Sequence, residues 1–146
     1  MSNIDASKMV FVFGSNEGGI HGAGAARFAY KERGARWGHS YGHYGQSFAI
    51  PTKGVIRERQ FDEARVGHTL PLDQIRDYVT GFLAYAKGHP ELQFQVTCIG
   101  CGLAGLKHAD IAPMFEQAPA NCFFDLKWKV WLEKTGRVND QYWGEA

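Results

Sequence analysis

Two glycine-rich turns and one lysine are the parts of this sequence whose residue types and spacing could carry chemistry. The first turn spans residues 14–24 and holds Asn16 among five glycines. Glycine admits a positive φ and lets several backbone N–H groups converge on one anion. A helix expected at residues 23–31 would add the positive end of its dipole. The first turn is therefore predicted to hold a phosphate.

The familiar phosphate motifs do not describe this first turn. No Lys-Ser or Lys-Thr pair closes it, as a P-loop requires, and the G-x-G-x-x-G spacing breaks at Arg27. Glycines at this density also occur in plain tight turns and at close contacts between strands and helices. The turn therefore needs a second, independent feature before it indicates a ligand site.

That second feature lies at the points where the predicted strands end. Apolar patterns predict a central strand at residues 10–13 and further strands at 47–52 and 93–99. The first turn, Lys53 and a second glycine-rich turn at residues 100–105 each follow one of these strands. Parallel sheets bind ligands outside the carboxyl ends of their strands. We therefore expect the two turns and Lys53 to share one cleft.

The remaining segments predict a layered α/β fold. The strand at 47–52 should end near Pro51, residues 54–70 indicate a solvated connection or a short helix, and an amphipathic helix should run from Pro71 to Gly88. There follow a helix at 108–117, a strand at 121–124, an amphipathic piece with Trp128, Trp131 and Leu132, and a loosely held tail from Gly136. Strands that alternate with helices predict a three-layer α/β/α sandwich with a mixed, largely parallel sheet.

Length and composition bound the class of protein. The chain of 146 residues suits one domain, because a chain of about this size buries about 70% of its unfolded surface. A net charge of +1 argues against a general nucleic-acid binder. No apolar run reaches the roughly 20 residues of a membrane span, and residues 1–8 lack the apolar stretch of a signal peptide. We expect a cytoplasmic protein that contacts no membrane.

Cysteines and histidines offer alternative sites. Cys98 and Cys101 have the C-x-x-C spacing of a redox pair or of half a zinc site, but a structural zinc needs four ligands and a redox pair usually lies at a helix start. His39 and His43 lie four residues apart in a glycine-rich stretch that is unsuited to a helix. No metal or cofactor is expected, and Cys98 is predicted to lie in the core.

The stretch at residues 34–46 alternates glycines with aromatic and imidazole rings. If this stretch has a structural role alone, its sequence predicts a hairpin-like loop. As a functional loop, residues 37–44 would be mobile without ligand and would close one ring over a flat ligand base.

Three motifs in order carry a family resemblance. They are N-x-x-G-x-x-G-x-G-x-A from Asn16 to Ala26, P-T-K ending at Lys53, and I-G-C-G-L from Ile99 to Leu103. Together they resemble a macrodomain, the ADP-ribose-binding fold, over about residues 11–124. Within that fold the chain is similar to the terminal ADP-ribose protein glycohydrolases and the DNA ADP-ribosylglycohydrolase antitoxins. It is also similar to small uncharacterised proteins carried by bacteriophages.

The resemblance implies a ligand and roles for named residues. ADP-ribose or a related nucleotide would bind between the turns, with its diphosphate on backbone N–H groups, a ribose on Asn16, and Lys53 as the catalytic group. ADP-ribosylated protein or DNA would be the partner. The ligand-binding residues that the resemblance implies are Asn16, Gly19, Gly22, Ala23, Gly24, Ala25, Gly100, Cys101, Gly102, Leu103, Ala104 and Gly105.

One position departs from this resemblance. In the terminal protein glycohydrolases an Asp follows the G-C-G-L run, whereas this chain has Ala104; the antitoxin type also has a small residue there. Three interpretations stay open. The protein is a hydrolase that removes ADP-ribose from protein or nucleic acid, a non-catalytic protein that binds or sequesters an ADP-ribose-like nucleotide, or a structural or interaction protein that has lost its ligand.

Overall fold

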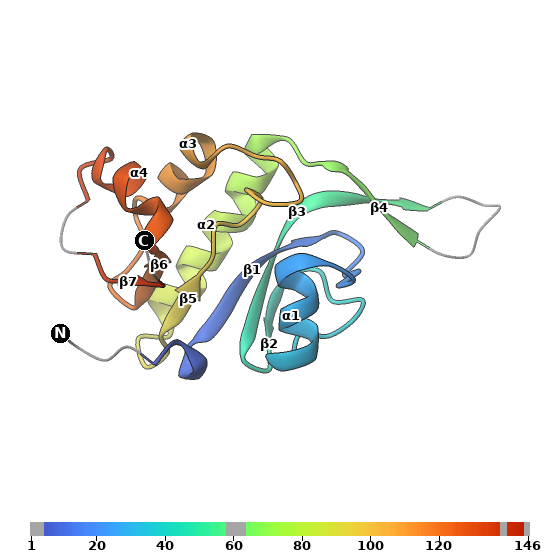
Figure 1. Cartoon of the computed structure of the whole chain (residues 1–146), viewed down its shortest axis with the longest axis horizontal. Coiled ribbons are helices and arrows are strands. Elements are labelled where there is room, and N and C mark those ends of the chain that lie inside the picture. The colour runs from blue at the N-terminus through green and yellow to red at the C-terminus, as the bar shows by residue number, and fades with distance from the viewer. Residues whose placement is uncertain (1–4, 58–63, 138–139, 145–146) are drawn as a thin grey trace.

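The computed structural model describes residues 5–57, 64–137 and 140–144, and it contains a seven-stranded mixed sheet with helices on both faces (Figure 1). The strands are β1 (Val10–Asn16), β2 (Gly42–Tyr44), β3 (Ser47–Arg57), β4 (Ala64–Thr69), β5 (Phe94–Val96), β6 (Cys122–Asp125) and β7 (Tyr142–Trp143). The α-helices are α1 (Gly24–Glu32), α2 (Leu72–Gly88), α3 (His108–Ile111) and α4 (Lys129–Glu133). Three short 3₁₀ helices are η1 (Ala6–Lys8), η2 (Ala112–Phe115) and η3 (Leu126–Trp128).

Strand β1 lies in the middle of the sheet. The strand order is β2-β3-β1-β5-β6-β7, and β4 also pairs with β3. The pairs along the path from β3 to β7 are parallel, whereas β2 and β4 both run antiparallel to β3. An uninterrupted apolar run suits β1 because both of its faces are covered. The predicted fold, a three-layer α/β/α sandwich with a mixed, largely parallel sheet, is confirmed.

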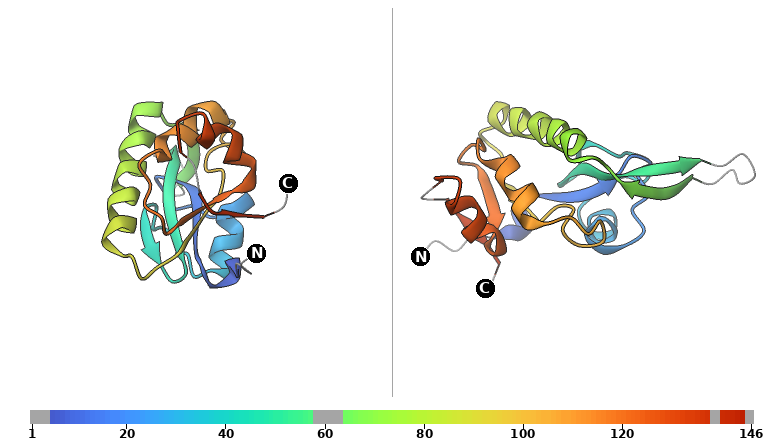
Figure 2. Two further views of the ribbon diagram at one scale, coloured as in Figure 1. Left: turned by 90° about the vertical axis from the view of Figure 1, so that its left-hand side faces the viewer. Right: turned by 90° about the horizontal axis from the view of Figure 1, so that it is seen from above.

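The two faces of the sheet carry cores of different size. On β1, Phe11 and Phe13 point to the α1 face, where they form a small cluster with alanines that include Ala26 and Ala29. Residues of alternate parity, such as Val10, point to the other face and join the larger core under α2, η2 and α4. The two turned views show the sheet between these helices (Figure 2). Small residues on α1 therefore bring that helix close to β1.

Helix α2 follows its predicted pattern. Ile75, Val79, Phe82 and Ala86 recur at a spacing of three or four residues and are all fully buried. Pro71 precedes the first helical turn. The helix predicted from Pro71 to Gly88 is therefore confirmed.

Strand β3 does not end near Pro51, as predicted, but continues to Arg57. It continues because β4 returns alongside it, with Lys53 opposite Thr69 and Val55 opposite Val66. The expected connection or short helix at 54–70 is therefore wrong where the structure describes it, while residues 58–63 lie outside the described residues. The β3–β4 ribbon extends past the helices (Figure 1).

Two other predicted elements are shorter or divided. The strand expected at 93–99 pairs only over Phe94–Val96, because the chain already turns where the Ile99 N–H donates to the Thr97 carbonyl at 2.8 Å. The helix expected at 108–117 divides into α3 and η2, with Pro113 in the second piece. Proline lacks the N–H that a continuous α-helix needs.

The tail from Gly136 is not loosely held at residues 140–143. Strand β7 pairs with β6, and the Trp143 Nε1–H donates to the Val96 carbonyl at 2.9 Å. Before it, Arg137 forms an ion pair with Asp140 and donates to the carbonyl of Ala118 at 2.9 Å. These distant partners fix a segment that looks like a polar tail in sequence. No helix in the described part of the chain is long and apolar enough to cross a membrane.

Candidate functional site

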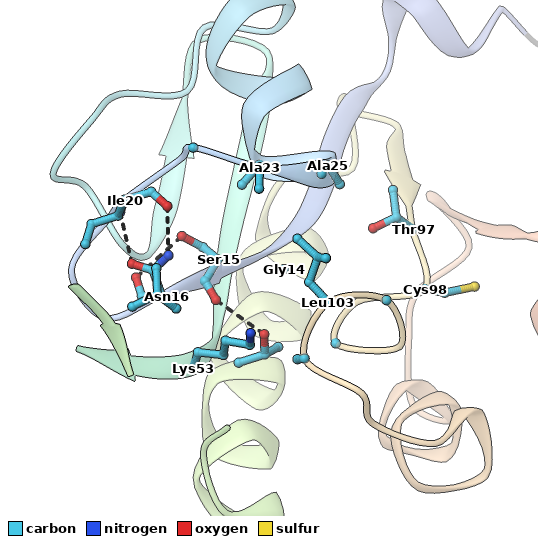
Figure 3. A pocket seen from close by; sticks show the side chains of 18 residues that line it. Gly14, Ser15, Asn16, Ile20, Ala23, Ala25, Lys53, Thr97, Cys98 and Leu103 are labelled. Carbon is cyan, nitrogen blue, oxygen red and sulfur yellow. Dashed lines mark hydrogen bonds between the residues drawn. The ribbon is translucent and has the colours of Figure 1, made fainter. Parts of the chain in front are cut away.

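A cavity of about 580 Å³ lies where the first and second turns meet (Figure 3). Its wall runs from the end of β1 through the start of α1, across Lys53 on β3, to the turn that follows β5. The lining residues are Gly14, Ser15, Asn16, Ile20, Gly22, Ala23, Gly24, Ala25, Ala26, Thr52, Lys53, Val66, Thr97, Cys98, Gly100, Gly102, Leu103 and Ala104. The structure therefore brings both turns and Lys53 together at one cleft, as predicted.

The first turn is shaped by the side chain of Asn16. Its Oδ1 accepts from the Ile20 N–H at 2.9 Å, and its Nδ2 donates to the Ile20 carbonyl at 2.8 Å. Within the same turn, the Gly19 N–H donates to the Asn16 carbonyl at 3.0 Å. These two hydrogen bonds use one N–H and one acceptor lone pair of the Asn16 amide. One N–H and one lone pair therefore remain for the predicted hydrogen bonds to a ribose.

The start of α1 opens into the cavity. Ala23 occupies the N-cap position and supplies no side-chain cap. The N–H groups of Gly24, Ala25 and Ala26 have no acceptor among the described residues, as is usual in a first helical turn. Free N–H groups and the helix dipole both favour an anion at this point.

The second turn offers a matching set of donors. The Cys101 N–H donates to the Cys98 carbonyl at 3.1 Å, and the Leu106 N–H donates to the Gly100 carbonyl at 2.8 Å, so these bonds close the turn. Within the described chain, the N–H groups of 102, 103 and 104 make no hydrogen bond. The two sets of unpaired donors therefore lie on opposite walls of one cavity.

Gly24 and Gly102 respond differently to an added side chain. Gly24 has a φ of +57°, and a Cβ there would lie 3.2 Å from Leu103 Cδ1, so a larger residue would strain the fold itself. A Cβ on Gly102 would meet nothing within 4 Å. Of these two cavity-lining glycines, Gly102 is the one that accepts a new side chain without straining the fold.

Lys53 is the one Lys, Arg, Asp or Glu among the described residues that line the cavity. No Asp or Glu occurs among the described lining residues. Ser15 lies opposite Pro51 and Asn16 lies opposite Lys53, with a register irregularity between these two pairs, and Ser15, Asn16 and Lys53 all line the cavity. The wall therefore combines one ammonium group with unpaired N–H donors, and it attracts negative charge.

Three predicted ligand residues do not line the cavity. Gly19 has a φ of +64° and lies so close to the backbone of Gly38 that a Cβ would be 2.4 Å from its carbonyl carbon. The Cys101 side chain packs against the α2-side core, and the Gly105 N–H closes the turn onto the Gly102 carbonyl at 3.0 Å. These residues shape the turns and stand back from the cavity.

The cavity also contains residues that the sequence did not mark as ligand residues. They are Gly14, Ser15, Ile20, Ala26, Thr52, Val66, Thr97 and Cys98. Positions adjoining the strand ends could have been found by asking which residues flank each turn. Val66 could not, because it lies in the stretch that was predicted as a connection.

The cysteines have the properties of structural thiols. Burial raises the pKa of Cys98 to about 12 and that of Cys101 to about 11, and nearby Asp125 and Asp110 respectively add to the rise. All three cysteines are free thiols. Across the described ranges, no group of three His, Cys, Asp or Glu residues could hold a metal ion.

The ring-bearing loop does not lie over the cavity. Its middle is tied to α2, since the Tyr41 hydroxyl donates to the Tyr78 carbonyl at 2.7 Å and His43 Nδ1 lies 2.5 Å from the Tyr85 hydroxyl. No residue of 37–44 lines the cavity in its described wall. Trp37, which is 52% exposed, comes nearest, because its Cη2 lies 3.9 Å from where a Cβ on Gly22 would be. The hairpin interpretation describes this stretch, because β2 pairs with β3.

Comparisons with known proteins leave the ligand open. The sequence matches no protein-family model and no curated protein. Its fold is similar to the solved structure of a protein of unknown function from Bacteroides thetaiotaomicron, at 13% sequence identity and a TM-score of 0.48. The similarity covers 79% of this chain and 82% of the other. A structural similarity this weak does not identify a function, and the functional proposal therefore rests on the cavity.

Proposed function

We propose that the protein binds ADP-ribose or a related nucleotide in the cavity between its two turns. The observation that carries this proposal is the presence of unpaired backbone N–H groups on both walls, with Lys53 beside them. Such donors match the two bridged phosphates of a diphosphate, which needs several N–H groups at close range. The resemblance to macrodomains supports the same ligand.

The size and lining of the cavity fit a small molecule with apolar surfaces. A volume of about 580 Å³ falls within the range of about 300–1,000 Å³ that is usual for ligand pockets. Apolar side chains of Ile20, Val66 and Leu103 come from three different segments and surround the glycine turns. They would contact the ribose or base, while the N–H groups hold the phosphates.

Titration calorimetry with ADP-ribose tests the proposal directly. We expect binding by the unaltered protein, and we expect Gly102→Val to weaken it by more than tenfold, about 1.4 kcal/mol, because the valine side chain would occupy the cavity. Gly88→Val is the matched control, since a Cβ there also meets nothing within 4 Å and Gly88 ends α2, away from the cavity. Absence of binding by the unaltered protein would refute the proposal.

Hydrolysis of an ADP-ribosyl bond is the finer form of this function. It would involve Lys53 as a nucleophile in its neutral form or as a charge-stabilising group in its protonated form. The decisive comparison is Lys53→Ala against the unaltered protein, on ADP-ribosylated protein and ADP-ribosylated DNA, with ADP-ribose affinity measured in parallel. Loss of turnover with retained affinity supports the hydrolase. Equal turnover in both proteins would remove the role of Lys53, whereas no turnover on either substrate would leave a non-catalytic nucleotide binder, which we place in the cytoplasm with its free thiols.

A further inference from the structure

A buried serine and a buried histidine form a pair at the wall of the cavity. Ser15 is 4% exposed and His21 is 1% exposed, and Ser15 Oγ lies 3.4 Å from His21 Nδ1. The other ring nitrogen, Nε2, lies 3.2 Å from the His39 carbonyl oxygen. A carbonyl can only accept, so Nε2 carries the proton and Nδ1 presents its lone pair to the Ser15 hydroxyl. The Ser15 hydroxyl therefore has two acceptors within reach, the neutral imidazole at 3.4 Å and the Asn16 carbonyl at 3.5 Å, and the imidazole is the nearer.

The surroundings of His21 keep it neutral. Burial lowers its pKa, the backbone carbonyls of His39 and Arg36 oppose this, and the His39 ring adds to the lowering. A second titratable side chain that packs against it is that of Tyr30 on α1, with ring centroids 6.5 Å apart. The Phe13 ring packs edge-on against the His21 ring, with ring centroids 5.5 Å apart. A buried Nδ1 needs a hydrogen-bond partner in any role, and here that partner is a serine of the cavity wall.

The position of Ser15 relates this pair to Lys53. Ser15 lies opposite Pro51 in the β1–β3 register, next to the pairing of Asn16 with Lys53. Both Ser15 and Lys53 line the cavity. Since its described wall contains no carboxylate, Ser15 offers the route by which a proton could leave the cavity for a buried base.

We propose that Ser15 and His21 act as a proton relay for hydrolysis of a glycosidic bond in this cavity, an inference that rests on the nucleotide-binding function proposed above. A bound water gives a proton to Ser15 Oγ while the Ser15 hydroxyl proton moves to His21 Nδ1. The water oxygen forms a bond to the anomeric carbon, and the electron pair of the breaking bond leaves with the acceptor group. Lys53 gives that group a proton; after product release, His21 returns its proton through Ser15 to water in the cavity, and Lys53 regains one from that water. The sum is one water consumed, with ADP-ribose and the protonated acceptor released.

The test compares Ser15→Ala with Ser15→Thr, which keeps the hydroxyl. ADP-ribose release is measured from ADP-ribosylated single-stranded DNA and from ADP-ribosylated protein. We expect Ser15→Ala to lower kcat by about 100-fold or more, as loss of general-base catalysis does, and Ser15→Thr to restore most of it. Affinity for ADP-ribose, measured by calorimetry, should be unchanged in Ser15→Ala.

The pH profile separates a relay from a purely structural role. The relay needs unprotonated His21, so kcat should fall as the pH drops through its pKa, which burial places below the ordinary histidine value of about 6.5. In His21→Asn, the fall of kcat at low pH should disappear. The double variant His21→Asn with Ser15→Ala should have the same kcat as Ser15→Ala alone. If His21→Asn does not fold, the two Ser15 variants and the pH profile of the unaltered protein still decide.

The outcomes distinguish this proposal from the proposed function. Turnover that persists in Ser15→Ala at the unaltered rate overturns the relay. A protein that binds ADP-ribose but releases none from either substrate also overturns the relay, and leaves the binding function intact. A protein that does not bind ADP-ribose removes both.

Discussion

Side chains hold the first turn in place, whereas the second turn is closed mainly by its own backbone. In the first turn, Asn16 forms two hydrogen bonds to Ile20, and Glu17 accepts from the Tyr78 hydroxyl at 2.8 Å and from Gln74 Nε2 at 3.2 Å. In the second turn, side chains form two hydrogen bonds among the described residues, from the Thr69 hydroxyl to the Ala104 carbonyl at 2.9 Å and from the Cys101 thiol to the Ile99 carbonyl at 3.5 Å.

Because of this difference, we expect the wall formed by the first turn and the wall formed by the second turn to have different roles in ligand binding. The first wall is anchored to α2 through Glu17 and presents its donors in a fixed arrangement. The second wall carries Leu103, which is 72% exposed and reaches across to Gly24. A fixed wall limits the ordering cost of binding, and a looser wall adjusts to the ligand. Four predictions test this division.

Thiol labelling tests whether the wall formed by the second turn opens enough to expose Cys98 and Cys101. Burial raises the pKa of Cys101 to about 11 and that of Cys98 to about 12, so thiolate is scarcer than in a free cysteine. We expect iodoacetamide at pH 8 to label the folded protein about 100-fold or more slowly than the urea-unfolded chain, with the difference shrinking as the pH rises toward 11. Labelling at the unfolded rate would show that the second turn opens freely.

Asn16→Ala removes the brace of the first turn. It leaves the Ile20 N–H and carbonyl without their partners in a partly buried region, so the free energy of unfolding should fall by about 2 kcal/mol. Urea denaturation measures the loss, and Asn16→Asp, which keeps the acceptor and loses the donor, should cost less. A change within experimental error would mean that the first turn does not depend on this side chain.

Hydrogen exchange compares the two walls in one experiment. Addition of ADP-ribose should slow exchange of the amides at 102–104 by about tenfold, because their N–H groups are unpaired before the ligand arrives. The Ile20 amide, which already donates to Asn16, should change little. Protection of the Ile20 amide equal to that of the amides at 102–104 would contradict the division, and the same experiment reports whether residues 37–44 become ordered.

Thr69→Val should have the smallest effect. It removes the exposed tie from the β3–β4 ribbon to Ala104, so the free energy of unfolding should change by about 0.5 kcal/mol. If the tie sets the position of the second turn, ADP-ribose affinity will fall more than stability does. Thr80→Val, whose hydroxyl donates within α2 to the Arg76 carbonyl, is the matched control.

The parts of this fold that could be predicted are those set by local pattern. The apolar run at 10–13 marks a strand covered on both faces, and the stripe from Ile75 to Ala86 marks α2. The meeting of the two turns follows from a general rule for parallel sheets, which needs only the strand ends. For the same reason most of the predicted ligand residues line the cavity.

The parts that could not be predicted depend on distant partners. Strand β4 has no apolar face of its own, because its stretch is polar and gains its structure only by pairing with β3. Strand β7 depends on Arg137, which joins Asp140 to carbonyls of a preceding segment. His21 lies among turn glycines, and only the fold brings the His39 carbonyl to its ring. The periodicity of apolar residues along the sequence contains no information about such contacts between distant segments.

The central place of β1 has a consequence for biosynthesis. The strand precedes both of its partners, residues 47–53 and 94–96, so about 80 further residues must be synthesised before both of its edges are paired. Closure of such long loops slows folding, and an apolar strand with open edges invites association between nascent chains. The cavity itself exists only after residue 104 has left the ribosome. We therefore expect a ribosome-bound chain that ends before this turn to engage chaperones and to bind no nucleotide.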